Sequence, residues 1–433
     1  MRPFLFAAAF LALASCNPSS GQESRPDYGA HPNISAPNAG MLPTVNAARA
    51  VGWPQGAKPT APPGMEVTAY MSGLEHPRWL YVLSNGDVLV ALASTEAETG
   101  GGIVGWVRNN VQRDAGAIGA GPNAIALLRD ANGDGVVDAH ALYAQNLRQP
   151  FGMVLLGDWL YVADTDAVLR YRYAPGDMRA AAPPETVIQL PYRRGGNGHW
   201  TRNIVARPDG QKLYVSVGSS SNIADNGIEA ERDRAAIWEI NPDGSGKRIF
   251  ASGLRNPNGM DFEPTTGALW TVVNERDMLG DTLPPDYLTS VRDGAFYGWP
   301  YSYWGAHVDT RVTPPRPDLV ARAIAPDYAL GAHTASLGLL FYRAALLPAH
   351  YRGGAFIGQH GSWNRSQRSG YKVVFVPFAN GRPSGDVEDF LTGFLNARSQ
   401  AQGRPVGVAV DRTGALLVAD DVGGVIWRVA PAR

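Results

Sequence analysis

The chain has 433 residues, 45% of them hydrophobic, and its 38 Lys and Arg residues nearly balance its 39 Asp and Glu residues, for a formal net charge of −1. This balance supplies neither the basic field that nucleic acid requires nor a polybasic membrane patch, so small or neutral partners are favoured. The single cysteine, Cys16, excludes a disulfide within the chain.

Residues 1–16 have the pattern of a bacterial lipoprotein signal. The apolar run from Phe4 to Ala14 has the length of a secretory signal and is too short to span a bilayer. Small residues then precede Cys16, as in the cleavage box of lipoproteins, so we predict that Cys16 is lipidated. An ordinary signal peptide with an incidental cysteine is the alternative. The prediction implies export and anchoring on the periplasmic side, at the outer membrane rather than the inner one because Asn17 is not acidic.

Residues 17–63 are rich in Pro, Ser, Asn, Gly and Ala and contain few large apolar side chains. Such a composition buries too little surface to repay the entropy of ordering, so we expect a flexible tether. Residues 64–433 are then expected to form one domain.

One hairpin pattern recurs through this domain: an apolar strand, a Gly-centred turn and a second apolar strand. Copies begin at His76, Gln149, Asn203, Asn256 and Arg404, with a looser copy from Leu337. Six hairpins of one pattern predict an all-β fold, a six-bladed β-propeller with long inter-blade loops. A two-sheet sandwich is the alternative, but sandwiches do not repeat one hairpin six times.

Between the first two hairpins lies the segment DANGDGVVD, residues 130–138, in which oxygen-bearing residues alternate around a glycine. This spacing is typical of calcium loops, although Ala141 replaces the glutamate of a full EF-hand. The alternative is a plain Asp/Gly turn. The expected ligands of a structural Ca²⁺ are Asp130, Asn132, Asp134, Val136 and Asp138.

Three later segments carry the candidate chemistry. In GGNGHWTRN, residues 195–203, glycines precede His199, which is the best candidate for a general base, although a lone histidine is often structural. The pair Arg255 and Asn256 suits a ligand that is carboxylate-bearing or polar and planar. The alternative is an Arg-Asn turn that is hydrogen-bonded to its own backbone. The segment NERDMLGD, residues 274–281, combines carboxylates with kinked backbone, as a Ca²⁺ site requires.

In their order, these motifs resemble the pyrroloquinoline quinone (PQQ)-dependent soluble aldose (glucose) and sorbosone dehydrogenase-like family. The resemblance runs from about Met65 to Val429 and rests on GGNGHWTRN, PDGQKLYVSVGSSSN, LRNPNGMDF, NERDMLGD and FYGWPYSY. It implies that PQQ lies over the channel mouth, that Ca²⁺ polarises it and that His199 takes a sugar hydroxyl proton. The implied PQQ contacts are Arg255, Asn256, Arg365 and Arg404. The implied calcium region comprises Glu275, Asp277, Met278 and Asp281, with the carbonyls of Asp277 and Met278 as ligands.

Two positions depart from the glucose enzymes of that family. Ser219 and Ser220 follow Gly218 where those enzymes carry an acidic residue, and Val406 stands where they carry a second arginine. The predicted activity is PQQ-dependent oxidation of an aldose or related sugar, with a quinone or cytochrome as electron acceptor. The alternatives are a metal-dependent lactonase, with Glu275 and Asn256 as ligands, and a non-catalytic binding propeller.

Overall fold

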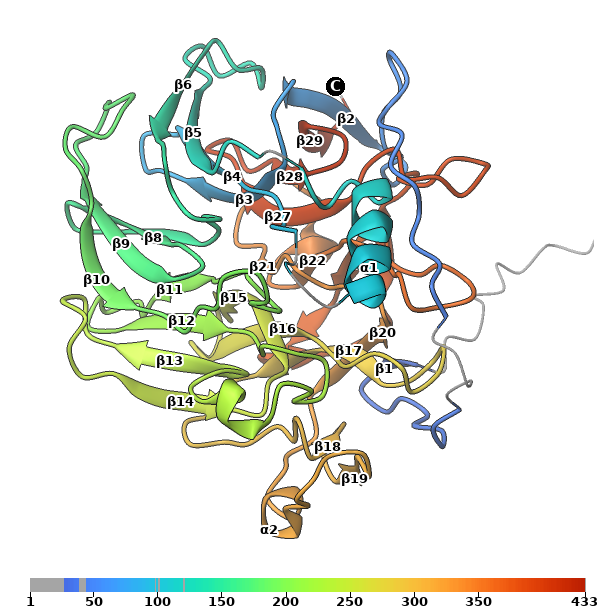
Figure 1. Cartoon of the computed structure of the whole chain (residues 1–433). Coiled ribbons are helices and arrows are strands. Elements are labelled where there is room, and N and C mark those ends of the chain that lie inside the picture. Colours follow the sequence, from blue (N-terminus) through green and yellow to red (C-terminus); the bar gives the residue numbers. More distant parts are fainter. Residues whose placement is uncertain (1–26, 39–43, 98, 100–101, 120, 433) are drawn as a thin grey trace, which may run out of the picture.

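The computed structural model describes residues 27–38, 44–97, 99, 102–119 and 121–432. Six sheets stand around a central axis as the blades of a propeller (Figure 1). This confirms the predicted all-β, six-bladed fold.

The blades follow the chain in order, and all their pairings are antiparallel. Blade 1 contains β3 (Pro77–Val82), β4 (Val88–Leu92), β5 (Ala124–Arg129) and β6 (Ala139–Ala144). Blade 2 contains β7 (Met153–Leu156), β8 (Trp159–Ala163), β9 (Ala167–Arg172) and β10 (Glu185–Gln189). Blade 3 contains β11 (Ile204–Ala206), β12 (Leu213–Val217), β13 (Ala236–Ile240) and β14 (Arg248–Ser252).

Blade 4 contains β15 (Asn256–Phe262), β16 (Leu269–Asn274), β17 (Pro285–Ser290) and β20 (Tyr328–Ala332), with β1 (Tyr28–Gly29) at its outer edge. Blade 5 contains β21 (Leu340–Phe341), β22 (Ala355–Gln359), β23 (Lys372–Val376) and β26 (Glu388–Leu391). Blade 6 contains β27 (Pro405–Val410), β28 (Leu416–Asp420), β29 (Val425–Pro431) and β2 (Met65–Ser72). The ring closes there, because the early strand β2 pairs with the last strand β29.

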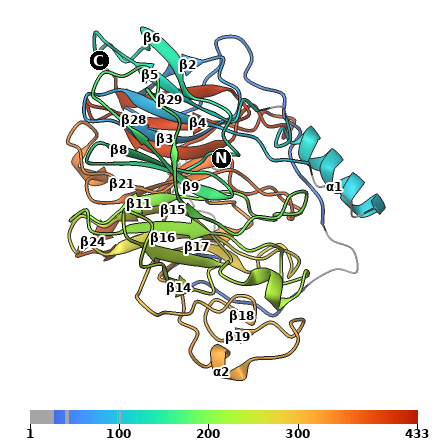
Figure 2. The same cartoon turned by 60° about the vertical axis from the view of Figure 1, so that its left-hand side comes forward.

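Short elements decorate the ring. Two small hairpins are formed by β18 (Ser302–Tyr303) with β19 (His307–Val308), and by β24 (Phe378–Ala379) with β25 (Arg382–Pro383). The helices are α1 (Gly102–Asp114) and α2 (Pro317–Val320), with single 3₁₀ turns at Ile228–Glu231 and Ala349–Tyr351. Helix α1 projects from the body of the propeller (Figure 2). The sequence analysis did not predict it.

The core lies between neighbouring blades, where the apolar strands pack face to face. Blades 5 and 6, for example, bury Phe356, Phe375, Val418 and Trp427 in one cluster. Removing this apolar surface from water at the blade interfaces stabilises the ring.

Where the structure describes the predicted tether, several of its residues contact the propeller. Residues 27–38 and 44–63, which we call the N-terminal strap, cross the ring near blades 4 to 6. Tyr28 and Gly29 pair with β20, and the amide of Val51 donates to the carbonyl of Ala401 at 2.8 Å. The Trp53 indole donates to Asp420 at 2.7 Å. Backbone hydrogen bonds and the contact of one half-buried indole therefore order a segment whose composition predicted flexibility.

Candidate active site

One edge of the propeller, which we call the rim, collects the candidate residues. The first strand of each blade begins at this edge and the second strand ends there, because the two form an antiparallel hairpin. His199, Arg255 and Arg404 lie just before or at the start of a first strand, whereas Ser219 and Glu275 follow second strands. The hairpin repeat thus brings together residues that are far apart in the sequence.

Contacts with Ser219 fix the orientation of His199. Its Nδ1 lies 3.1 Å from the carbonyl oxygen of Ser219 and 3.0 Å from the hydroxyl oxygen of the same residue. That hydroxyl donates its own proton to the carbonyl of Ser221, so both neighbours of Nδ1 act as acceptors. The Nδ1 position therefore carries the proton and Nε2 keeps its lone pair. Ser219 thus orients the imidazole.

Two glycines allow this close approach. A Cβ on Gly198, whose φ is +66°, would lie 2.2 Å from the carbonyl oxygen of Ser220. A Cβ on Gly218 would lie 2.6 Å from the Cβ of His199 and 2.4 Å from Oδ1 of Asn256. Side chains at either position would force the histidine loop away from the rim.

His199 is neutral at physiological pH. Burial, together with the neighbouring Arg255 charge, lowers its pKa to about 3. A neutral imidazole whose Nε2 has no hydrogen-bond partner among the described residues can accept a proton, so the arrangement suits a general base.

Arg255 holds the loop that follows β16. Its guanidinium donates to the carbonyl of Glu275 at 2.6 Å, to the side chain of Asn222 at 2.9 Å and to Asp277 at 3.2 Å. The adjacent Asn256 is different, because its buried Oδ1 accepts no hydrogen bond from the described residues. Asn256 is therefore the member of this pair with unused hydrogen-bonding capacity among the described residues.

The N-terminal strap binds the other two predicted cofactor arginines. Arg365 donates to the Asp27 carboxylate at 3.0 Å, and Arg404 donates to the carbonyl of Ala48 at 3.0 Å. Arg404 also stacks on Tyr371, and its buried Nε has no partner among the described residues. The strap oxygens thus sit where carboxylate oxygens of an anionic ligand would be expected to bind.

Each residue of the expected calcium region has partners of its own. The carbonyl of Asp277 accepts hydrogen bonds from Asn222 at 3.2 Å and from Nε of Arg276 at 3.0 Å, and that of Met278 accepts one from Arg311 at 3.2 Å. Guanidinium groups thus donate hydrogen bonds to the carbonyl oxygens that would bind a cation. Because these donors carry positive charge, the arrangement does not fit Ca²⁺.

The carboxylates of this region point to different partners. The Asp277 carboxylate contacts His333 at 3.2 Å. Burial alone would raise the pKa of Asp277, but the bond to His333 and the Arg255 charge lower it below its usual value. Asp281 accepts hydrogen bonds from Ser366. Burial raises the pKa of Glu275 to about 7. Among the described residues, no group of three or more His, Cys, Asp and Glu side chains is placed to hold a metal ion.

In the loop of residues 130–138, the oxygen-bearing side chains fold back onto the backbone. Asp130 accepts from the amides of Gly133 and Gly135 at 2.6 and 2.9 Å, and Asp138 accepts from Ala131 at 2.7 Å. Asn132 and Asp134 accept from amides two residues further on, the latter from Val136. These contacts describe a turn that is stabilised by hydrogen bonds within the loop itself. Calcium binding at this loop stays a prediction.

The sequence analysis missed a buried cluster on the same rim. Asp421, after β28, accepts hydrogen bonds from Arg78 of β3 and, at 2.8 Å, from Nε2 of His360, which follows β22. Burial lowers the pKa of His360 to about 4, although the contact with Asp421 opposes this shift. Three different blades supply these residues, so no local pattern joins them. The available signal was the segment GQHGSWNRS, which drew attention only to Arg365.

The fold and the rim therefore define a propeller with a neutral histidine and several buried or half-buried arginines at one edge. A family model described as TrAA12-like matches residues 59–284 and 319–432, and the chain belongs to this family.

Solved structures show the same fold. The PQQ domain of pyranose dehydrogenase from Coprinopsis cinerea, in its holo form, is 21% identical with a TM-score of 0.68, covering 89% of this chain and 100% of that one. A Trichoderma reesei enzyme of carbohydrate-active family AA12 is also 21% identical with a TM-score of 0.68, covering 86% of this chain and 98% of that one. An uncharacterised protein of Borreliella burgdorferi is 29% identical over 295 residues, 66% of this chain and 76% of that protein. The resemblance to the PQQ-dependent sugar dehydrogenases is confirmed.

Cys16 lies outside the described residues. Within the described part of the chain, no helix combines the length and the apolar character needed to cross a membrane.

Proposed function

We propose that the protein is a PQQ-dependent dehydrogenase that oxidises an aldose or a related sugar. One observation carries the proposal: His199 is neutral, with Nδ1 held by Ser219 and Nε2 free, on the arginine-rich rim of a TrAA12-like propeller. The printed names of the solved relatives support the substrate class.

The rim residues fit a planar, multiply carboxylated cofactor. Among the described residues, the buried Nε of Arg404 and the amide oxygen of Asn256 have no hydrogen-bond partner. The guanidinium of Arg365 donates to the Asp27 carboxylate, which a carboxylate of the cofactor would replace. These groups would bind and orient PQQ, which when bound supplies the acceptor for a hydride.

In the reaction, His199 Nε2 takes the proton of a sugar hydroxyl as the hydride leaves the same carbon, and the C–O bond becomes a carbonyl. The Ser219 carbonyl stabilises the imidazolium that forms, because it accepts the Nδ1 proton. The expected Ca²⁺ takes no part in these steps.

The test is sugar-dependent reduction of an artificial electron-accepting dye by the purified protein. We expect dye reduction that requires both sugar and added PQQ. Lactone hydrolysis with a divalent metal and no PQQ-dependent reduction would favour the lactonase alternative. Sugar binding without either reaction would favour a binding propeller.

We also propose that the protein is exported and anchored by a lipid on Cys16, with the propeller on the periplasmic side and a quinone or cytochrome as electron acceptor. The signal-like pattern of residues 1–16 supports this proposal.

A further inference from the structure

The loop after β16, residues 274–281, is held by a segment that the family match leaves out. The TrAA12-like model covers residues 59–284 and 319–432, so residues 285–318 lie outside the match. This segment contains the hairpin of β18 and β19, which lies apart from the ring of blades (Figure 1). Asp309 and Arg311, just after the hairpin, contact the loop. The family match therefore does not specify what these two residues do.

Arg276 and Asp309 form a buried ion pair beside the loop. Nη1 of Arg276 donates to the Asp309 carboxylate, and both side chains are only 2% exposed. The same guanidinium donates to the carbonyl of Asp277, through Nε at 3.0 Å and through Nη2. Asp309 thus fixes the guanidinium, and the guanidinium fixes the backbone of the loop.

Arg311 holds the next carbonyl of the loop. Its Nη1 donates to the carbonyl of Met278 at 3.2 Å, and its backbone amide donates to Asp309 at 3.1 Å. Met278 has a φ of +69°, a left-handed conformation that a residue other than glycine keeps only when its surroundings hold it. The amide of Met278 also donates to Asn364 at 2.8 Å. Contacts on both sides of this residue therefore maintain the conformation of the loop.

Two further cations neutralise the Asp277 carboxylate. Arg255 donates to it at 3.2 Å, and Nδ1 of His333 lies 3.2 Å from it. Nε2 of His333 lies 2.9 Å from the carbonyl oxygen of Gly280. Both ring nitrogens therefore face acceptors, so both carry protons and the ring is positively charged. With the two arginines that hold the carbonyls, four cations surround the loop.

We propose that these four cations take the place of a calcium ion beside the loop, and that PQQ therefore binds without a divalent cation. The cationic clamp, as we call the set, comprises Arg255, Arg276, Arg311 and His333. This inference rests on the proposed function, because it states what cofactor binding requires. A divalent cation at the loop would need the oxygens of Asp277 and Met278 as ligands. It would be repelled by the positive charges that already contact those oxygens.

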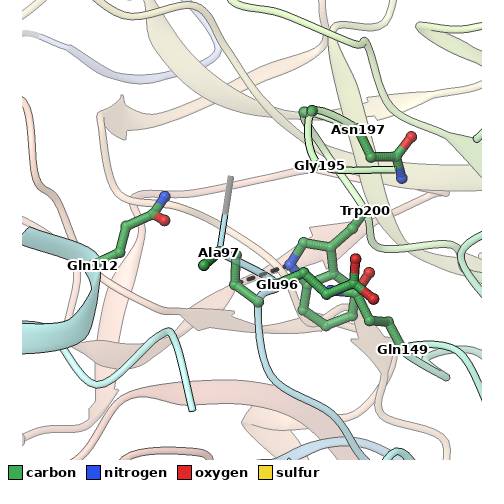
Figure 3. Close-up of a pocket in the computed structure, with 10 residues that line it drawn as sticks. Glu96, Ala97, Gln112, Gln149, Gly195, Asn197 and Trp200 are labelled. Carbon is green, nitrogen blue, oxygen red and sulfur yellow. Dashed lines mark hydrogen bonds between the residues drawn. The ribbon is translucent and has the colours of Figure 1, made fainter. Parts of the chain in front are cut away.

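A small pocket elsewhere on the rim supplies a control (Figure 3). Glu96, Gln112 and Trp200 are among its lining residues, and none of the described residues that line it is Lys, Arg or His. Glu96 is therefore a carboxylate of the rim that lies outside the clamp. Glu96→Gln tests whether a change of PQQ affinity with Ca²⁺ comes from cation binding at another carboxylate.

The test compares PQQ affinity in Ca²⁺ buffer and in chelator, by absorption titration of the purified protein. Arg311→Met removes one member of the clamp at a side chain that is 38% exposed. Arg276→Met is combined with Asp309→Asn, because removing one partner alone would leave a buried charge uncompensated. The matched control is Arg316→Met, which removes the exposed pair with Asp318 in the same segment. Thermal unfolding confirms that each variant is folded.

We expect the wild-type affinities in the two buffers to differ by less than about threefold. In Arg311→Met, PQQ binding in chelator should weaken by about three- to tenfold, because the loop loses a hydrogen bond. Ca²⁺ should restore most of this loss, because the carbonyl of Met278 becomes free to bind it. The combined variant should show the same pattern, and both controls should match the wild type in each buffer.

Two results would overturn the proposal. One is a wild type that binds PQQ more than about threefold more tightly in Ca²⁺ than in chelator. The other is a set of clamp variants whose affinities match the wild type in both buffers, or fall equally in both. An equal fall would show that the clamp residues stabilise the loop without standing in for a cation.

A second measurement, without PQQ, separates this inference from the proposed function. It uses Asp134→Ala as the background, because residues 130–138 are a predicted calcium loop. Ca²⁺ should leave the melting temperature of Asp134→Ala unchanged and should raise it by about 2 °C or more once Arg311→Met is added. If the protein binds no PQQ, this result removes the dehydrogenase and keeps the clamp. A rise in Asp134→Ala alone, or none after the second substitution, would then remove the clamp as well.

Discussion

Replacing His199 with alanine should reduce sugar-oxidising turnover by about 10²-fold, at the low end of the range for general-base catalysis. The magnitude follows from the environment of the imidazole. With its pKa lowered to about 3, His199 is fully neutral at pH 7, but it is also a weak proton acceptor. A 10²-fold loss corresponds to about 2.7 kcal/mol of activation free energy.

The assay is steady-state dye reduction at saturating PQQ, together with a PQQ titration of each variant. PQQ affinity should stay nearly unchanged in His199→Ala, because proton abstraction exists only in the transition state. The matched control is Ser219→Ala, which leaves the backbone carbonyl at 3.1 Å from Nδ1 and should cost less than about fivefold.

The pH dependence follows from the same pKa. Because burial depresses the pKa of His199 below its usual value, protonation inactivates the base only as the pH falls toward 3. Turnover should therefore show no loss from this residue between pH 8 and pH 5. Full turnover in a folded His199→Ala variant would refute the reasoning, and a loss in His360→Ala instead would move the base to the Asp421 cluster.

Four further predictions address the cofactor, the strap, the calcium loop and the anchor. Arg404→Ala should weaken PQQ binding by about 2 kcal/mol in a titration, with near-normal turnover at saturation; unchanged affinity would remove it from the cofactor site. Asp27→Asn should tighten PQQ binding by about three- to tenfold, because Arg365 loses its carboxylate partner; equal affinity would place Arg365 outside the cofactor site. Asp134→Ala should lower thermal stability in calcium buffer but not in chelator, and an equal loss in both would show a plain turn. Cys16→Ser should release the protein from membrane fractions, and undiminished membrane association would contradict lipidation.

The sequence predicted the blades because each hairpin is local. The turns at Asn85-Gly86, Asp209-Gly210 and Thr413-Gly414 join strands whose apolar residues identify them without long-range information. The same reading missed α1, although Ile103, Val107 and Val111 are spaced as on one helical face. This helical pattern is short, and the Gly and Pro residues that interrupt the apolar runs elsewhere in the chain favoured strands throughout.

The candidate site was only partly predictable. His199 stands out in its own loop, but its orientation depends on Ser219, from the next strand pair. The binding of Arg365 and Arg404 by the N-terminal strap could not be predicted, because it depends on contacts over more than three hundred residues of chain. The composition of a segment indicates how much surface it can bury by itself. The strap is instead ordered by its hydrogen bonds to the propeller, which composition does not indicate.

The most direct test of the central claim is an absorption titration of the purified apo-protein with PQQ, in Ca²⁺ and in chelator, followed by addition of sugar. We predict saturable binding with one PQQ per chain and bleaching of the oxidised cofactor when sugar is added. A difference between the two buffers would show that a cation enters the site after displacing the arginine contacts at Asp277 and Met278. No PQQ binding in either buffer would contradict the account.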